Sequence, residues 1–272
     1  MKKQTGRIII YTLVAAFAFA CAKVPITGRR QLKLLPESEL VAMSLTSYNQ
    51  FLTENKVVNT GTDAATIKRV GDKISKAVTT YLTANKYAER VEGYNWEFNL
   101  VQDNTVNAWC MPGGKVVFYT GIIPYCKDET GIAVVMGHEI AHAIARHGNE
   151  RMSQGVATQL GGVALAVAIA DKPQETQQLF AAAYGIGSQV GLMLPFSRKH
   201  ESEADEMGLY FMAMAGYNPK EAPAFWERMN AVGGTRPPEF LSTHPNPDTR
   251  VNNLNKWMPK AQKYYTASQA KP

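Results

Sequence analysis

The sequence predicts an α+β fold, a mainly helical domain with a small antiparallel sheet beside a helix that carries the pentapeptide HEIAH. Apolar residues recur at spacings of three and four in several long segments, which is typical of amphipathic helices. Alternation of apolar and polar residues, typical of half-buried strands, is confined to residues 94–120. A hydrophobic content of 45% over 272 residues is sufficient for a substantial core.

Residues 1–20 have the pattern of a secretory signal peptide. Three cations precede the apolar run IIIYTLVAAFAFA, which is too short to be a good membrane span. These cations carry half of the formal net charge of +6, and they are Lys2, Lys3 and Arg7. The rest of the sequence has no basic stripe with interleaved aromatic residues, so nucleic acid is not an expected partner.

Cys21 follows the signal segment in the tetrapeptide AFAC, which resembles a bacterial lipobox. In a lipobox the cysteine becomes the lipid-modified N-terminus, so we expect attachment to a membrane through Cys21. Ala22 rather than Asp follows, which in a Gram-negative lipoprotein resembles the sorting pattern for the periplasmic face of the outer membrane. Ala18 and Phe19 depart from the usual lipobox, so an ordinary signal-peptide cysteine and cleavage without lipidation are the alternatives.

The remaining chain is predicted to consist of a tether, one large domain and a tail. Residues 21–37 are rich in turn formers and cations, which indicates a tether, and residues 259–272 are predicted to be a loose polar tail. The large domain is expected at residues 38–258, with helices at 38–55, 63–83, 155–170 and 248–257. The helix at 155–170 is apolar enough to be buried or to flank a groove, with weak insertion into lipid as the alternative.

Three short strands are predicted before the HEIAH helix. Trp96, Phe98 and Leu100 alternate along the first strand, and the second covers residues 106–111. The tripeptide PGG at 112–114 indicates a turn, after which KVVFYT returns as the third strand. A small antiparallel sheet is therefore expected.

His138 and His142 of HEIAH are four residues apart, so on a helix they lie on one face. Glu139 is one step round the helix, close enough for its carboxylate to reach a water held between the two imidazoles. This HExxH arrangement is typical of zinc hydrolases, and the alternative is that both histidines are satisfied core residues. Asp128 is predicted to cap the start of this helix, and Gly148 is predicted to end it.

A catalytic zinc ion usually has three protein ligands, so one more is needed. Glu201 and Asp205 are four residues apart on a predicted helix and share a face. One carboxylate can bind the metal while the other fixes the tautomer of a ligand histidine. Glu203 and Glu206 suit a solvated acidic helix start instead.

Four ordered motifs, HEIAH, SRKHESEAD, NAWCMPGG and STHPNPDTR, resemble the gluzincin metallopeptidases of the Ste CAAX-prenyl endopeptidase and HtpX group. Because the chain has neither transmembrane helices nor a repeat domain, it is most similar to stand-alone periplasmic lipoprotein proteases of the LoiP and BepA kind. The resemblance implies a zincin (gluzincin) fold for residues 38–258 and one Zn²⁺ per chain. It also implies that Glu201 is the third zinc ligand and that Asp205 contacts a ligand histidine.

The same resemblance implies a zinc-dependent endopeptidase. Zinc would activate a water molecule, and Glu139 would take its proton and pass it to the leaving amine. Asn107, Ala108 and Trp109 match the family's active-site edge strand, which pairs with an extended peptide through main-chain hydrogen bonds. Such pairing tolerates many sequences, which favours unfolded or misassembled envelope proteins as substrates and quality control as the role. The alternative for this strand is a covered structural edge.

His244 and Arg250, the third and last residues of STHPNPDTR, are candidates for the remaining position around the metal. His244 is expected either to fill the fourth ligand position or to donate to the oxyanion, with Arg250 supplying charge or acting as the donor itself. The alternative is a rigid helix start, stiffened by Pro245 and Pro247, with an incidental histidine.

Cys110 and Cys126 lie in a chain expected to be exported, where a disulfide can form between them, and two buried free thiols are the alternative. A competing function is a non-catalytic binding or assembly factor at the outer membrane that retains a structural zinc. Glu139 favours the enzyme, because a purely structural site has no use for a general base.

Overall fold

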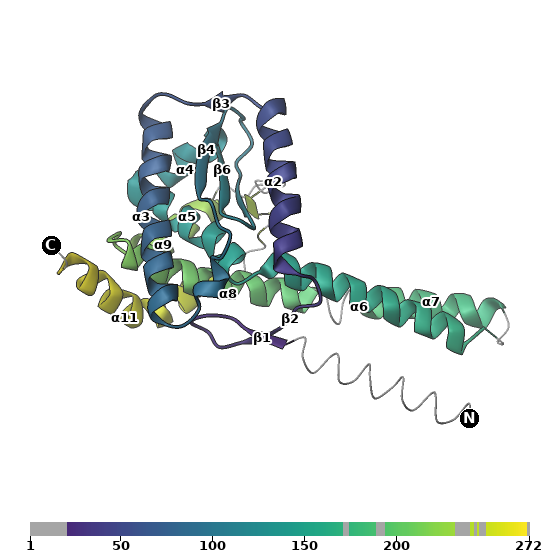
Figure 1. The fold of residues 1–272 in the computed structure, drawn as a ribbon. Helices are drawn as coiled ribbons and strands as arrows, with labels where there is room; N and C mark the ends of the chain where they lie inside the picture. Colours follow the sequence, from purple (N-terminus) through teal and green to yellow (C-terminus); the bar gives the residue numbers. More distant parts are fainter. Residues whose placement is uncertain are drawn as a thin grey trace.

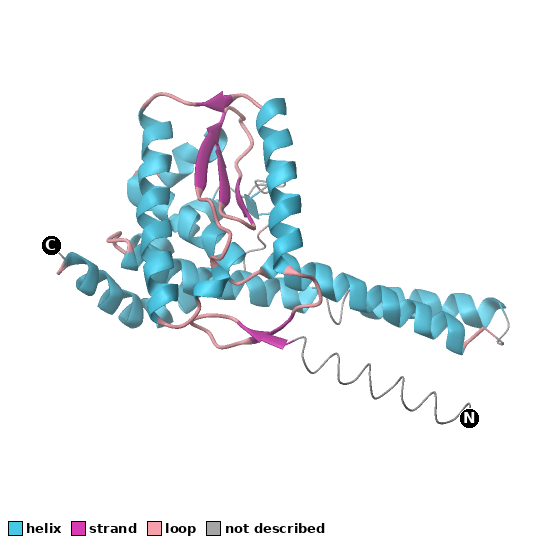
Figure 2. Ribbon diagram, in the orientation of Figure 1, coloured by secondary structure: helices cyan, strands magenta, loops and turns pink. Residues whose placement is uncertain are grey.

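A computed structural model describes residues 21–170, 174–188, 194–231, 240–241, 244 and 249–270. The predicted signal peptide, residues 1–20, lies outside the described residues. Helices dominate, with a small four-stranded sheet and a separate two-stranded hairpin among the described residues (Figure 1, Figure 2). The prediction of a mainly helical α+β fold is confirmed. No described helix combines the length and the apolar character needed to cross a bilayer.

Nine α-helices are described, with a short 3₁₀ helix after α3 and another before α4. Their bounds are α2 Glu37–Glu54, α3 Thr62–Ala84, α4 Ile123–Cys126, α5 Glu129–Ile144, α6 His147–Ala168, α7 Gln174–Ser188, α8 Leu194–Met214, α9 Glu221–Ala231 and α11 Arg250–Gln269, with 3₁₀ helices at Ala88–Arg90 and Thr120–Ile122. The predicted helices at 38–55 and 63–83 correspond to α2 and α3, each within one residue at either end.

The main sheet has the strand order β3-β4-β6-β5. Its strands are β3 Val57–Val58, β4 Glu97–Val101, β5 Ala108–Met111 and β6 Lys115–Tyr119. The hairpin from β5 to β6 is antiparallel as predicted, and Gly113 and Gly114 adopt positive φ in its turn. The pairing of β4 with β6 is parallel, so the expectation of a purely antiparallel sheet is wrong for this pair. After β4 the chain crosses to the edge of the sheet and forms β5. Strand β6 then turns back and lies between β4 and β5, so it runs parallel to β4.

The two faces of the sheet pack against different helices. Phe98 and Leu100 of β4 lie in the main core with residues of α3, α5 and α8, as the alternation predicted. Val101 and Val117 face the opposite way and pack with Tyr48 of α2. Helix α5 therefore lies buried on one side of the sheet, while α2 covers the other side (Figure 1).

Residues 21–37, expected to be a tether, instead form a hairpin packed on the domain. Strand β1, Cys21–Lys23, pairs antiparallel with β2, Arg30–Leu32. Val24 is fully buried, and the Gln31 side chain donates to the backbone carbonyl of Ala145 at 2.7 Å. The turn formers of this segment thus fold the chain back rather than extend it.

The tail after residue 258 is also structured. Helix α11 continues through Pro259 to Gln269, so the expectation of a loose tail from residue 259 is wrong. Ala261 is buried, and the Tyr264 ring packs against Tyr81 of α3 and Tyr210 of α8. This segment is polar in composition, but one narrow face of the helix is apolar and packs against α3 and α8. Asp248, the first residue of the helix predicted at 248–257, lies outside the described residues.

The HEIAH helix ends earlier than predicted. Asp128 caps α5 as expected, because its side chain accepts the backbone N–H groups of Thr130 and Gly131. Arg146, rather than Gly148, has the left-handed backbone conformation that reverses the chain, with φ of 58°. Its guanidinium donates to the Glu89 carbonyl at 2.8 Å, which holds the turn in place. Gly148 lies inside α6.

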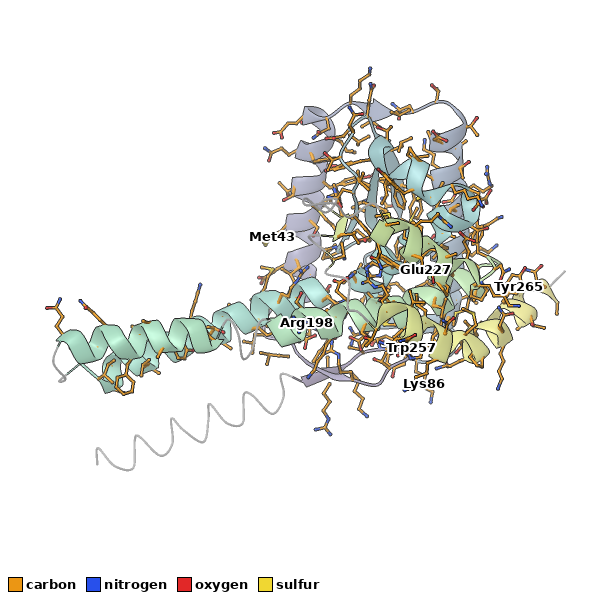
Figure 3. The ribbon with its side chains drawn as sticks, turned by 180° about the vertical axis from the view of Figure 1, so that it is seen from behind. Met43, Lys86, Arg198, Glu227, Trp257 and Tyr265 are labelled. Carbon is orange, nitrogen blue, oxygen red and sulfur yellow. The ribbon has the colours of Figure 1, made fainter. Side chains whose placement is uncertain are left out.

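Helices α6 and α7 project from the body as a pair (Figure 1), held together in part by the Tyr184 hydroxyl, which donates to the Thr158 carbonyl at 2.8 Å. Seen from behind, the pair extends away from the body, which holds most of the side chains drawn (Figure 3). The predicted apolar helix at 155–170 is therefore not buried. The large exposed apolar side chains of α6 follow one another along the helix at spacings of three and four residues. We call this set the α6 stripe, and it consists of Met152, Val156, Leu160, Val163 and Val167.

Arg29 fastens the N-terminal hairpin to the body. Its guanidinium lies 2.7 Å from a carboxylate oxygen of Glu150 on α6 and 2.7 Å from one of Glu203 on α8. Both carboxylates are almost completely buried. Burial raises the pKa of Glu150, but hydrogen bonds from Arg29 and His200 outweigh this and lower it to about 2.

Replacing Arg29 with Met should lower the free energy of unfolding by about 3 kcal/mol at neutral pH, because two buried carboxylates lose their cation. The pKa of Glu150 is depressed, so its contribution is present above pH 4.5 and is lost as the pH falls towards 2. Urea unfolding followed by circular dichroism should show a smaller acid loss in the variant. Arg69→Met, which breaks an exposed pair with Glu129, is the control. Equal losses for the two variants would contradict this role.

Candidate metal centre

The metal centre is built where helices α5 and α8 cross. A Cβ atom added at Gly137 would lie 2.7 Å from the backbone oxygen of Gly208. One added at Gly208 would lie 2.7 Å from the backbone nitrogen of His138. No side chain fits in either place, so the two glycines let the backbones approach closely. This brings His138 and His142 on α5 against Glu201 on α8.

Four side chains converge on one point: His138, His142, Glu201 and His244. The Nε2 atoms of His138 and His142 are 3.1 Å apart. The Glu201 carboxylate oxygens lie 3.3 Å from Nε2 of His138 and 3.4 Å from Nε2 of His142. The structure thus brings together the three predicted zinc ligands.

These separations fit a zinc ion. Ligand atoms at 2.0–2.1 Å from a tetrahedral zinc are about 3.3 Å from one another. The observed separations of 3.1–3.4 Å match this value closely. Imidazole and carboxylate are ligand types that zinc prefers, and converging lone pairs in a buried site repel one another unless a cation lies between them. The metal is zinc.

Asp205 lies on the far side of His138, as the sequence predicted. One of its carboxylate oxygens is 3.0 Å from Nδ1 of His138, which leaves Nε2 to face the metal. Burial lowers the pKa of His138, but Asp205 and Glu201 outweigh this and raise it to about 9. In the metal-free protein the His138 ring is therefore the doubly protonated imidazolium near neutral pH. Zinc binding must displace the proton on the nitrogen that faces the metal.

Glu139 is buried beside the metal site without a strong partner. Its Oε1 atom accepts no hydrogen bond from the described residues, and the nearest ring nitrogen, Nε2 of His244, is 3.5 Å away. Burial raises the pKa of this carboxyl group. A carboxylate in this position is suited to accept a proton.

His244 completes the group. Its Nδ1 atom lies 3.2 Å from Nε2 of His138 and 3.2 Å from a carboxylate oxygen of Glu201. These distances place His244 at the fourth corner of the ligand set. Residues 242–243 and 245–248, which include Pro245 and Pro247, lie outside the described residues.

Arg250 does not face an incoming substrate, which corrects its proposed role as an oxyanion donor. Its guanidinium donates to Asp205 at 2.6 Å and to Glu201 at 3.2 Å, and it lies over the Trp226 ring at 3.8 Å. The side chain is 1% exposed. Arg250 therefore holds the two acidic residues in place from behind.

A second histidine–carboxylate group lies behind His142, and sequence reasoning missed it. His147, the first residue of α6, contacts both His142 and Glu203. Glu203 is 6% exposed, so its assignment to a solvated helix start is wrong. The available signal was the third histidine of HEIAHAIARH, five residues after His142.

The predicted substrate strand lies at an edge. β5 is the last strand in the sheet order, and it contacts α5. Asn107 precedes β5, and its side chain accepts the Ala108 N–H at 2.9 Å. The Trp109 ring points away from the metal site and packs edge-on against Phe51 of α2, with ring centroids 5.1 Å apart. The Trp109 side chain therefore takes no part in the metal site, and the main chain of this strand lies at the edge of the sheet.

Cys110 and Cys126 are not joined. Both are free thiols, Cys110 on β5 and Cys126 buried at the end of α4, so the predicted disulfide is absent from this structure. Burial raises the pKa of both thiols, which lowers the fraction of each that is the reactive thiolate.

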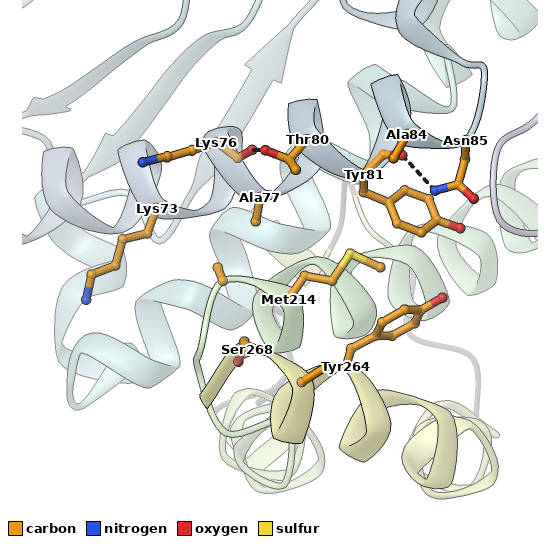
Figure 4. A pocket seen from close by; sticks show the side chains of 12 residues that line it. Lys73, Lys76, Ala77, Thr80, Tyr81, Ala84, Asn85, Met214, Tyr264 and Ser268 are labelled. Atoms are coloured by element: carbon orange, nitrogen blue, oxygen red, sulfur yellow. Dashed lines mark hydrogen bonds between the residues drawn. The ribbon is translucent and has the colours of Figure 1, made fainter. Parts of the chain in front are cut away.

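One described pocket lies away from the metal centre. It has a volume of about 440 Å³ and lies between α3, the end of α8 and α11. Tyr81 and Tyr264 approach each other across it, and Lys73 and Lys76 flank its α3 side (Figure 4). It contains none of the converging ligands, so we assign it no part in the chemistry.

Fold and site together define a metallopeptidase of the HExxH type. The sequence profile described as Peptidase family M48 matches residues 68–258. The chain therefore belongs to peptidase family M48. This confirms the class that the four motifs indicated.

Several relatives support the same class. The chain is 40% identical to the mitochondrial metalloendopeptidase OMA1 of Schizosaccharomyces pombe over 169 residues, which are 61% of this chain and 48% of the relative. It is 31% identical to Metalloendopeptidase OMA1, mitochondrial, of Homo sapiens over 259 residues, 92% of this chain and 48% of the relative. It is 31% identical to the Beta-barrel assembly-enhancing protease of Escherichia coli over 177 residues, 60% of this chain and 35% of the relative.

The chain thus spans about half the length of the OMA1 relatives that it matches. Mitochondrial and bacterial proteins appear among these relatives. The narrower likeness to lipoprotein proteases of the LoiP and BepA kind is therefore not specifically supported, whereas the family is.

Gly208→Ala tests the close crossing of α5 and α8. The added methyl group would meet the His138 backbone, so we expect unfolding to become easier by about 1–3 kcal/mol and zinc affinity to fall. Thermal unfolding and competition with a zinc chelator measure the two effects. Gly155→Ala, on α6 with open space around its Cβ position, should be neutral or slightly stabilising. Similar behaviour of the two variants would refute this explanation.

Proposed function

We propose that this protein is a zinc-dependent endopeptidase that cleaves unfolded or misassembled polypeptides as quality control in a bacterial cell envelope. The observation that carries the proposal is the buried Glu139 carboxylate beside the converging His138, His142 and Glu201. A zinc site with a purely structural role would not need a buried carboxylate at its edge with one oxygen, Oε1, that accepts no hydrogen bond from the described residues.

In the proposed reaction His138, His142 and Glu201 hold the zinc ion. Zinc at this position would polarise the peptide carbonyl and make water a nucleophile near neutral pH. Glu139 accepts the proton of the attacking water, for which its burial and raised pKa suit it, and then protonates the leaving amine. Asp205 and Arg250 keep the ligands oriented during these steps.

We propose that the substrate lies along β5 as an added strand. Ala108 and Cys110 alternate along β5 with the residues whose main-chain groups are hydrogen-bonded to β6. The N–H and C=O groups of Ala108 and Cys110 therefore point away from β6, towards the open edge of the sheet. Because Asn107 already accepts the Ala108 N–H, binding would exchange this bond for one to the peptide. An extended backbone is the only requirement, which favours unfolded chains.

Two features support a place at a membrane. Cys21 is the first residue of the packed N-terminal hairpin, so an acyl chain there would hold the body close to a bilayer. The α6 stripe offers apolar side chains with no charged residue between 152 and 170. The Escherichia coli relative is named for β-barrel assembly, which is consistent with substrates in the envelope.

Glu139→Gln should keep zinc and the fold but lose at least 100-fold in turnover, because it removes the base and not a ligand. Metal analysis and cleavage of a reduced, unfolded protein, with its native form as the comparison substrate, measure both points. Full activity in this variant would sink the proposed mechanism. Stoichiometric zinc without hydrolysis by the wild type would favour the non-catalytic binding factor. Preference for the native form would contradict strand addition.

His244→Ala tests whether His244 latches the metal. Because Nδ1 of His244 lies at the fourth corner, its removal should free that position and raise basal turnover several-fold. Kinetics with a peptide substrate and zinc affinity measure the effect. Lower turnover would instead make His244 the oxyanion donor. Unchanged turnover and affinity would assign it to the scaffold.

Cys21→Ser tests the membrane attachment. Wild-type protein should carry an acylated N-terminal cysteine and fractionate with membranes, whereas the variant should be unacylated and largely released. Mass spectrometry of the mature N-terminus and flotation with phosphatidylcholine vesicles measure this. Any residual flotation should disappear when Val163 and Val167 are also changed to Gln. An unmodified N-terminus at another residue would refute the lipid anchor.

A further inference from the structure

We propose that His147 and Glu203 position the zinc ligand His142, so that each ligand histidine has its own buried carboxylate. The inference rests on the proposed function to the extent that His142 must hold zinc. His138 meets Asp205 directly, whereas His142 reaches Glu203 through His147. We call the second arrangement the His147 relay.

The relay is a continuous line of short contacts. His142 turns Nε2 towards Glu201 and the metal position, so Nδ1 is its free end. This Nδ1 lies 2.8 Å from Nδ1 of His147. The other nitrogen of His147, Nε2, lies 2.9 Å from a carboxylate oxygen of Glu203.

When both histidine rings are neutral, only one placement of their protons gives each of these contacts a hydrogen-bond donor and an acceptor. A metal-binding Nε2 carries no proton, so Nδ1 of His142 carries one and donates it to Nδ1 of His147. His147 then bears its own proton on Nε2 and donates it to Glu203. Every donor faces an acceptor. The relay therefore fixes both the tautomer and the ring orientation of His142.

Glu203 is itself immobilised. Arg29 donates to its carboxylate from Nε at 2.9 Å and from a terminal nitrogen at 2.7 Å, and the Thr27 hydroxyl also donates to it. The His147 side chain is fully buried. The anchor of the relay is thus the N-terminal hairpin, which lies more than a hundred residues before His142 in the chain.

The position of His142 explains why orientation from outside is needed. It lies in the last turn of α5, which ends at Ile144, and Arg146 then reverses the chain. Helix ends fray more readily than helix centres, where His138 lies. Contacts from α6 and α8 hold the His142 ring where its own helix does not.

A neighbouring pair provides a matched control. Glu150 also pairs with Arg29, and it lies 2.9 Å from Nε2 of His200. The His147 and His200 rings are stacked, with centroids 4.3 Å apart. The two acidic residues thus share the same arginine and similar burial. They differ in that the histidine of Glu203 continues to a metal ligand.

The experiment compares Glu203→Gln with Glu150→Gln in the full chain. Zinc affinity is measured by chelator competition. The visible absorption bands of the Co²⁺-substituted protein report the geometry of the metal site, and urea unfolding gives the stability of the metal-free protein. Glu203→Gln should weaken zinc affinity about 10- to 100-fold and shift the Co²⁺ bands. Glu150→Gln should destabilise the metal-free protein similarly but change affinity less than threefold.

Two further variants separate hydrogen bonding from packing. His147→Phe should lose zinc affinity as Glu203→Gln does, whereas His147→Gln, whose amide can accept from His142 and donate to Glu203, should recover part of it. Equal affinities and unshifted Co²⁺ bands in Glu203→Gln, or equal losses in both glutamate variants, would overturn the relay. Wild-type protein that binds no zinc would instead overturn the proposed function.

Discussion

The site depends on one close approach, the crossing of α5 and α8 at Gly137 and Gly208. Helix axes normally stay 8–10 Å apart because side chains lie between them. With no Cβ on either side, the backbones come into direct contact. His138 follows Gly137 directly, and Asp205 and Glu201 lie about one and two turns before Gly208. The crossing therefore sets the distances between metal ligands that come from different helices.

Helix α8 carries its buried acidic residues on two faces, and an arginine pairs with each face. Glu201 and Asp205 face α5 and receive Arg250 from α11. Glu203 faces α6 and receives Arg29 from the N-terminal hairpin. Buried carboxylates are costly without a cation nearby. The two ends of the described chain are thus tied to α8 by the charges that the metal site requires.

Local patterns in the sequence predicted much of the site. Helical spacing predicted that His138 shares a face with His142 and that Glu201 shares one with Asp205, because residues four apart on a helix share a face whatever surrounds them. The cap at Asp128 and the turn at 112–114 are equally local. The resemblance to a known family supplied the choice of Glu201 over Asp205 and the attention to His244.

The predictions that failed concern contacts between distant segments. Arg29 and Glu203 are 174 residues apart, and no periodicity relates them. The parallel pairing of β4 with β6 depends on the order in which strands join the sheet, which alternation does not reveal. An apolar pattern predicted the helix at 155–170 but not its exposure, and a polar pattern hid the packing of α11. Composition describes a segment, whereas burial depends on what the rest of the chain places against it.

These contacts between distant segments explain the role of both halves of the segment HEIAHAIARH. Its first half supplies the chemistry, because two ligands and a base lie within five residues of one buried helix. His147 belongs to the next helix, because the chain reverses at Arg146. That reversal turns His147 back onto His142, which continued helix would have left about a turn and a half away on another face. The early end of α5 is therefore part of the site, since the reversal lets a residue outside the helix orient the ligand at its end.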